Sequence, residues 1–246
     1  MATLLGGCAL WRPATVPLRV IAEPARCAAP PATLIVLLPG SYSMPEEFLR
    51  EGFVQTVREK QLAADLVLVD AHVGYYNNRS IVERLRVDVI EPARAKGYRH
   101  IWLAGISIGA VGAMIYADAQ PADVDGVVLL APYLGTRLTA LEIKRAGGLA
   151  AWRAPDRATA DDLDLTLWHW LQLQTAAAGT AQPVPLFLGY GLDDRFAFND
   201  DVLGQALPPS RVFTAPGGHD WPAWRVLWHQ VVEVLPISRD STCVRR

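Results

Sequence analysis

The sequence predicts an α/β fold, in which a mostly parallel sheet is covered by helices on both faces. Short apolar runs alternate with longer segments of helical spacing from Thr33 onward, as in strands joined by crossover helices. The runs are apolar at their centres, which is typical of strands buried on both faces. A chain of 246 residues, of which 51% are hydrophobic, can bury one sizeable core. We expect an N-terminal segment and connector over residues 1–32 and a single domain over residues 33–246.

Each short apolar run is expected to form one strand of the sheet. These runs are residues 33–38, 65–69, 100–104, 124–130 and 185–190, with a short addition at 212–214. Residues 18–22 are expected to supply a reduced antiparallel strand before them. The helical segments are residues 45–60, 80–96, 108–119 and 221–234, and the second places Val82, Leu85, Val89 and Ile90 on one side. Residues 135–181 are too long for a simple connection and are expected to form a helical cap insertion.

The strongest local motif is the run Gly105-Ile106-Ser107-Ile108-Gly109, between a predicted strand and an Ala- and Gly-rich predicted helix. A serine on such a sharp turn projects at the end of the strand, and small flanking residues avoid collision with neighbouring backbone. The turn also places the serine at a helix N-terminus, where the N–H of Ile108 points toward the reacting oxygen. This context predicts Ser107 as a catalytic nucleophile.

An acid and a histidine follow Ser107 in the chain order that this motif requires. Asp194 lies just after the run 185–190 and fits the spacing best, while its neighbour Asp193 stays open as the alternative. His219 lies in a Gly-rich loop before the last predicted helix, where its imidazole can reach the serine. The other positions, His100, His169 and His229, are expected to be structural or surface residues. The sequence therefore predicts Asp194 to orient His219 as general base.

A third segment, Leu37-Leu-Pro-Gly-Ser-Tyr42, ends the first long strand. Where a serine on such a turn is the nucleophile, the loop after this strand supplies a second N–H for the oxyanion, besides the N–H of Ile108. The backbone N–H of Ser41 or of Tyr42 is expected to fill that role, and both remain open.

These segments together resemble the oxyanion loop, nucleophile, acid and base of the α/β-hydrolase superfamily. The resemblance covers most of the chain from Thr33 onward, and the ending Gly217-Gly-His-Asp-Trp221 is similar to that of small bacterial serine esterases. It implies ester hydrolysis through an acyl-enzyme on Ser107, with no metal and no organic cofactor. Esters of short to medium acyl chains are the expected substrates. Acyl transfer by the same triad, and a binding protein that keeps the fold without turnover, are the alternatives.

Aromatic residues and one histidine are expected near the substrate. His72, Tyr75 and Tyr76 follow the strand 65–69 and are interpreted as substrate-binding residues at the same edge of the sheet as Ser107. Trp152, Trp168 and Trp170 fall in the predicted cap, where pocket lining and ordinary helix packing predict the same residues.

Charge and hydropathy exclude several other partner classes. The net charge is −2, and no stretch gathers basic residues into a surface for nucleic acid. No apolar run reaches the roughly 20 residues that span a bilayer, and the nearest, residues 101–117, is interrupted by Ser107 and three glycines. The cysteines lack the spacing of a zinc site. Leu5-Gly6-Gly7-Cys8 is similar to the end of a lipoprotein signal, so two expectations stand: a cytoplasmic chain as written, or an exported chain with a lipid anchor at Cys8 if the true start lies upstream. Export would permit a Cys27–Cys243 disulfide, which the sequence does not predict.

Overall fold

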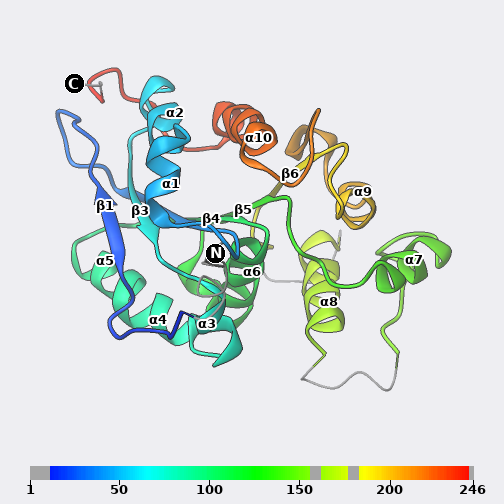
Figure 1. Ribbon diagram of the computed structural model, residues 1–246. Coiled ribbons are helices and arrows are strands. Elements are labelled where there is room, and N and C mark those ends of the chain that lie inside the picture. Colours follow the sequence, from blue (N-terminus) through cyan, green and yellow to red (C-terminus); the bar gives the residue numbers. More distant parts are fainter. Residues whose placement is uncertain (1–11, 156–161, 177–182, 244–246) are drawn as a thin grey trace, which may run out of the picture.

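The computed structural model describes residues 12–155, 162–176 and 183–243, and these residues form a sheet between two layers of helices (Figure 1). The sheet has seven strands in the order β1-β3-β2-β4-β5-β6-β7, and β1 alone pairs antiparallel. The strands are β1 Val20–Glu23, β2 Thr33–Leu38, β3 Ala64–Val69, β4 His100–Ile106, β5 Gly126–Leu130, β6 Leu186–Gly191 and β7 Val212–Ala215. The predicted fold class is confirmed, and each predicted strand is present with its ends shifted by at most two residues.

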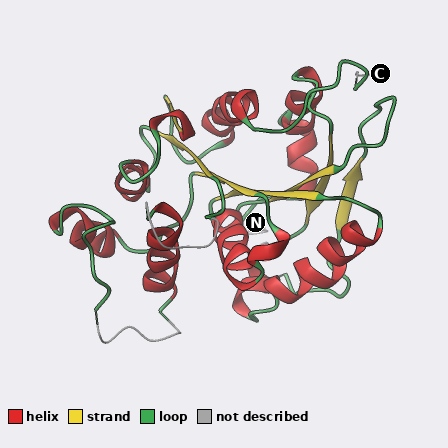
Figure 2. Ribbon diagram, turned by 180° about the vertical axis from the view of Figure 1, so that it is seen from behind, coloured by secondary structure: helices red, strands yellow, loops and turns green. Residues whose placement is uncertain are grey.

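The helices lie on both faces of this sheet, as Figure 2 shows from behind. The α-helices are α1 Pro45–Arg50, α2 Phe53–Glu59, α3 Val73–Asn77, α4 Ile81–Leu85, α5 Glu91–Ala95, α6 Ile108–Ala119, α7 Arg137–Arg145, α8 Leu163–Thr175, α9 Ala197–Gly204 and α10 Trp221–Val234. A π-helical segment, Arg86–Ile90, joins α4 to α5. Helices α1, α2 and α10 cover one face, and α4, α5, α6 and α8 cover the other (Figure 1).

Strand β2 explains why the apolar runs do not alternate with polar residues. All six of its residues are buried, and successive side chains point to opposite faces. Leu34 and Leu38 join the core under α6, whereas Ile35 and Leu37 join the core under α2 and α10. Because both faces are covered by helices, apolar residues follow one another without alternation from Leu34 to Leu38.

Two segments that were predicted as single helices are interrupted, each for a local reason. The segment 45–60 divides into α1 and α2 at Gly52, whose φ of 78° lies in the left-handed region that favours glycine. The segment 80–96 contains the π-helical turn just before Pro92, where the N–H of Glu91 donates to the carbonyl of Arg86. Proline lacks the N–H that a regular α-helix would use at that point.

The insertion 135–181 carries α7 and α8, separated by residues that include the undescribed segment 156–161. Its three tryptophans, Trp152, Trp168 and Trp170, are all buried in the core on the α6 side. The indole N–H of Trp168 donates to the carbonyl of Leu134. Packing, rather than pocket lining, therefore accounts for these tryptophans. None of the described helices is long and apolar enough to cross a membrane.

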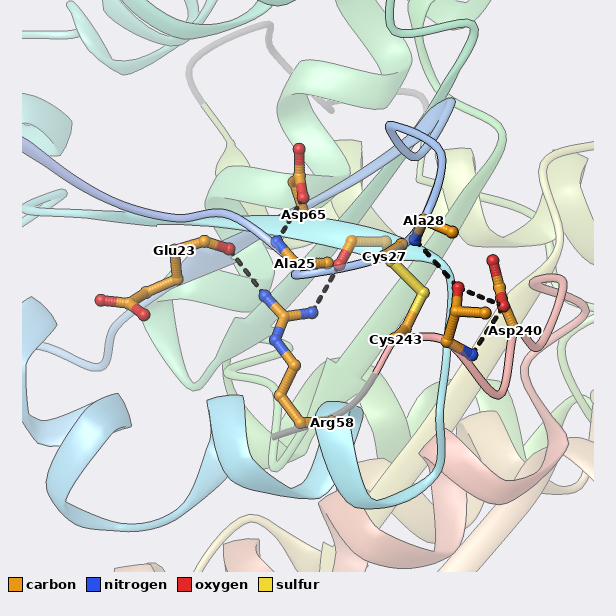
Figure 3. The surroundings of a disulfide bond; sticks show 10 residues. Glu23, Ala25, Cys27, Ala28, Arg58, Asp65, Asp240 and Cys243 are labelled. Carbon is orange, nitrogen blue, oxygen red and sulfur yellow. Dashed lines mark hydrogen bonds between the residues drawn. A yellow bond between two sulfur atoms is a disulfide. The ribbon is translucent and has the colours of Figure 1, made fainter. Parts of the chain in front are cut away.

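A disulfide joins the connector before β2 to the segment after α10 (Figure 3). Cys27 bonds to Cys243 across a sequence separation of 216 residues. Nearby, the N–H of Ala28 donates to the hydroxyl of Thr242, and the N–H of Asp240 donates to the carbonyl of Gln61. Arg58 donates to the carbonyls of Glu23 and Ala64 in the same region. The sequence did not predict this bond, because nothing in it places two segments so distant along the chain side by side.

We expect replacement of both Cys27 and Cys243 by serine to lower the free energy of unfolding by about 3–5 kcal/mol, because opening so large a loop returns conformational entropy to the unfolded chain. Urea unfolding of the oxidised protein and the double variant measures the difference. Cys8→Ser is the matched control, since it removes a thiol and keeps the disulfide. Equal midpoints for the double variant and the control would contradict a stabilising bond.

Candidate active site

Ser107 lies on the turn between β4 and α6, at the carboxyl end of the sheet. Its φ of 55° is positive, and it is the N-cap of α6. Such a conformation is costly for a residue with a Cβ and is retained where the surroundings fix it. The N–H of Ser107 donates to the carbonyl of Leu130 on β5, and its own carbonyl accepts from the N–H of Ala110. The backbone is thus held on both sides, and the side chain is aimed at the end of the sheet.

The two glycines of the motif permit this turn by allowing close backbone contact. A Cβ on Gly105 would lie 2.2 Å from the carbonyl carbon of Gly109, and a Cβ on Gly109 would lie 2.3 Å from the carbonyl oxygen of Leu38. Either side chain would therefore displace backbone rather than a flexible neighbour. Gly109 also brings the start of α6 against the end of β2, where the loop containing Gly40 begins. The glycines thus place Ser107 beside the predicted oxyanion loop.

Asp194 and His219 form a direct pair. The Nδ1 of His219 lies 2.7 Å from Oδ2 of Asp194, and Oδ1 of Asp194 accepts the N–H of Phe196 at 2.8 Å. The Asp194 side chain is fully buried, whereas Asp193 is exposed. A carboxylate at Nδ1 fixes the tautomer that leaves Nε2 free to accept a proton. Of the two aspartates left open by the sequence, the structure brings Asp194 to the histidine.

Two aromatic rings flank the imidazole of His219. The ring of Phe196 packs edge to face against it at 5.0 Å between centroids, and the ring of Trp224 does so at 5.2 Å. These rings restrict rotation of the imidazole while Asp194 holds its Nδ1 side. Neither residue was predicted from the sequence, although Trp224 lies only five residues after His219, in a run rich in tryptophan. His100, His169 and His229 are all exposed, away from this group.

Ser107 and His219 line the same cavity, which measures about 390 Å³. The other lining residues are Gly40, Ser41, Tyr42, Ser43, Glu47, Arg195, Asp220, Trp221 and Trp224. The predicted oxyanion loop therefore forms one wall, and Trp221 and Trp224 of α10 contribute apolar surface. No described residue of the cap insertion lines this cavity. We call it the reaction cavity.

The N–H groups expected to hold an oxyanion are available. Within the described ranges, the backbone N–H groups of Ser41, Tyr42 and Ile108 donate to no protein acceptor. Ile108 is the first residue of α6, where a helix leaves its N–H groups unpaired. Ser41 and Tyr42 lie in the turn that the N–H of Ser43 closes onto the carbonyl of Gly40. Oriented donors on two sides of a serine can stabilise a developing negative charge.

The three residues predicted to bind substrate occupy different environments. His72 is buried and lines a second cavity, which borders residues 41–43. Tyr75 is buried with its hydroxyl donating to the carbonyl of Thr15, and Tyr76 places its hydroxyl in the core beside Gly112. Burial raises the pKa of Tyr76. Neither tyrosine lines the reaction cavity or this second cavity. Of the three residues predicted to bind substrate, only His72 therefore lines a cavity.

One buried acid near the site was not predicted. Asp200, in the first turn of α9, has no exposed surface, and neither of its carboxylate oxygens has a hydrogen-bond partner among the described residues. Burial, together with the nearby negative charge of Asp194, raises the pKa of Asp200 well above its ordinary value. A buried carboxyl without partners is costly to ionise.

We expect Asp200→Asn to stabilise the protein in a pH-dependent way. A carboxyl whose pKa is raised on folding stays protonated in the folded chain at pH values where it is already ionised in the unfolded chain. The free energy of unfolding therefore falls as the pH rises above the unfolded-state pKa near 4. The gain from Asp200→Asn should be small at pH 4 and reach about 1–3 kcal/mol at neutral pH. Urea unfolding across this range measures it, with the exposed neighbour variant Asp201→Asn as control. A gain that shrinks with rising pH would contradict the assignment.

Two further expectations concern a metal site and a lipid anchor. In the ranges 12–155, 162–176 and 183–243, no group of three or more His, Cys, Asp or Glu side chains could hold a metal ion. The predicted anchor, Cys8, lies outside the described residues.

Comparison with known proteins was made with family models, curated sequences and solved structures. No family model matches the chain, and no curated protein matches it. Solved structures do match, at low sequence identity and over most of both chains. The fluorophosphonate-binding serine hydrolase F of Staphylococcus aureus is 15% identical, covers 88% of this chain and 97% of its own, and has a TM-score of 0.56.

Two further solved structures give the same picture. Est1E of Butyrivibrio proteoclasticus with bound ferulic acid is 16% identical, with coverage of 88% of this chain and 92% of its own and a TM-score of 0.55. The monoacylglycerol lipase of Paleococcus ferrophilus is 14% identical, with coverage of 88% and 97% and a TM-score of 0.51. Likeness at this identity establishes a shared fold.

Proposed function

We propose that this chain, which has the α/β-hydrolase fold, is a serine hydrolase that cleaves carboxylic esters through an acyl-enzyme on Ser107. The observation that carries the proposal is the contact of 2.7 Å between Nδ1 of His219 and Oδ2 of Asp194. This same His219 lines one cavity together with Ser107, which lies on a strained turn. Similar structures that bear the names serine hydrolase, esterase and lipase support the same reaction class.

The proposed reaction has two halves. In the first, Nε2 of His219 takes the proton of the Ser107 hydroxyl as its oxygen attacks the ester carbonyl, and Asp194 stabilises the imidazolium that forms. The N–H of Ile108 and that of Ser41 or Tyr42 hold the oxyanion. His219 then returns the proton to the leaving alcohol. In the second half, water attacks the acyl-enzyme by the same route and releases the acid and free Ser107.

Hydrolysis is favoured over acyl transfer because polar residues border the reaction cavity. Glu47, Arg195 and Asp220 all line it, and Tyr42 at its wall is 76% exposed. An acyltransferase excludes water from its acyl-enzyme, which a cavity with charged walls does not do. We therefore propose a small-molecule ester as substrate and water as the acyl acceptor.

We expect esters of short to medium acyl chains to be the best substrates. Trp221 and Trp224 offer limited apolar surface, so each added methylene should raise kcat/KM by up to about fourfold, from about 0.8 kcal/mol of burial, until the cavity is full. Turnover of p-nitrophenyl esters from acetate to palmitate measures this, with the Ser107→Ala protein as background. The charged rim should also prevent activation by detergent micelles. A maximum at palmitate, or a rate jump above the micelle threshold, would refute the expectation.

A further inference from the structure

A second cavity of about 350 Å³ adjoins the reaction cavity. Its lining is Arg12, Ser41, Tyr42, Ser43, Met44, His72, Val73 and Gly74. Residues 41–43 line both cavities, so the loop that carries the proposed oxyanion donors is their common wall. A substrate that binds its ester at Ser107 and extends past this loop would place the end remote from the scissile bond in the second cavity. We call this space the distal cavity.

The imidazole of His72 has a defined tautomer in the distal cavity. Its Nδ1 accepts the N–H of Gly74 at 3.1 Å as the N-cap of α3. Burial, and then the positive charge of Arg12, lower the pKa of His72, so the ring is neutral at neutral pH. A neutral ring that accepts at Nδ1 carries its proton on Nε2. His72 therefore offers the distal cavity a hydrogen-bond donor.

Arg12 adds further donors at the same cavity. Its guanidinium forms an ion pair with Asp70 and also contacts the sulfur of Met44 at 3.1 Å. A guanidinium has five N–H donors, so these contacts leave several free, and the side chain is 33% exposed. Asp70 pairs with Arg12 and lies near Arg19, which itself pairs with Glu46. No aspartate or glutamate is among the residues that line the distal cavity, so none of these lining side chains would repel a carboxylate or carbonyl oxygen there.

We propose that the distal cavity binds the remote end of the ester substrate and selects a hydrogen-bond acceptor there, a carbonyl or a carboxylate oxygen. Nε2 of His72 and the free N–H groups of Arg12 are the selecting donors. The inference rests on the proposed ester hydrolysis and names its substrate class. An acceptor at that position would pair with the buried imidazole of His72 and with the partly exposed Arg12, whereas a methyl group would pair with neither. Such pairing discriminates between otherwise similar substrates.

The test compares esters of equal reach that differ in their remote end. The acyl series uses p-nitrophenyl esters of hexanoic, 5-oxohexanoic and adipic acid, which end in a methyl group, a ketone and a carboxylate. A second series places a methyl, ketone or carboxylate end on the alcohol of a butyrate ester. The readout is the ratio of kcat/KM for each acceptor ester to that for its methyl counterpart. Because both values come from one preparation, the ratio does not depend on the fraction of folded enzyme.

In one of the two series, this ratio should fall about tenfold or more in Arg12→Gln and in His72→Asn. Asparagine at position 72 keeps an N-cap acceptor for the N–H of Gly74, while its shorter side chain removes the donor at the place of Nε2. Arg86→Gln, which removes an exposed arginine paired with Glu91 elsewhere, is the control and should leave the ratio unchanged. The ketone and carboxylate arms identify which acceptor is preferred.

Ratios that stay at the wild-type value in both variants and both series would overturn the distal-cavity proposal. In that case the proposed function would still stand, provided that wild-type protein hydrolyses the methyl-ended esters and Ser107→Ala does not. Hydrolysis of none of these esters would instead overturn the proposed function and the substrate class with it.

Discussion

Ser107→Ala should lose turnover by on the order of 10⁶ in kcat, the scale of loss when a triad nucleophile is removed. The hydroxyl is the attacking group in the proposed reaction, and neither the oxyanion donors nor the Asp194–His219 pair can form an acyl-enzyme without it. The fold should persist, because the removed oxygen borders the reaction cavity and the backbone of residue 107 is held by Leu130 and Ala110. Initial rates on p-nitrophenyl butyrate, with circular dichroism as a check on folding, measure the effect.

Covalent labelling separates loss of the nucleophile from loss of a binding residue. A fluorophosphonate probe should add one phosphonyl group to the wild-type protein, on Ser107, and none to Ser107→Ala. Ser210→Ala, at an exposed position in a short turn after α9, is the matched control and should label as the wild type does. Wild-type turnover in Ser107→Ala, or a label on another serine, would remove Ser107 from the proposed role.

Asp194→Asn should lower kcat by on the order of 10⁴, and Asp193→Asn should change it little. An asparagine at position 194 can still accept the N–H of Phe196 through its Oδ1, which leaves its NH₂ group facing Nδ1 of His219. That contact favours the wrong tautomer, with the proton on Nε2, so the ring can no longer take the proton of Ser107. Asp193 is an adjacent and exposed residue of the same type, which makes its variant the matched control.

Steady-state rates for both variants on one ester decide between the two positions. A larger loss in Asp193→Asn than in Asp194→Asn would transfer the orienting role to Asp193. Equal and small losses would indicate that the 2.7 Å contact with His219 is structural only.

The sheet and its longest helices could be predicted because local patterns determine them. Helix α6 has the predicted bounds since the serine turn marks its start and small apolar residues continue it, and α10 begins where Asp220 caps it. Helices α3 and α9 were not predicted. In α9 the buried face includes Asn199 and Asp200, so polar residues stand where a hydrophobic pattern would be sought.

The candidate triad could be predicted from chain order, but its surroundings could not. Phe196 and Trp224 meet His219 only when the loop after β6 and the start of α10 come together. Arg12 reaches the distal cavity from the N-terminal segment by pairing with Asp70, a contact between residues far apart in the sequence. Spacing along the chain carries no information on such pairs, because they depend on tertiary packing.

The bond between Cys27 and Cys243 also changes how the molecule would carry a mechanical load. A tensile force applied across this bond is transmitted from one cysteine to the other through the covalent bridge rather than through the hydrogen bonds among β2 to β7. Strand β1 lies outside the bridge, so a pull on the N-terminal side would load its hydrogen bonds to β3. Strands β2 to β7 and the loop with Ser107 lie mechanically shielded inside a closed covalent ring when the bond is present, and they are coupled in series with the load when the bond is reduced.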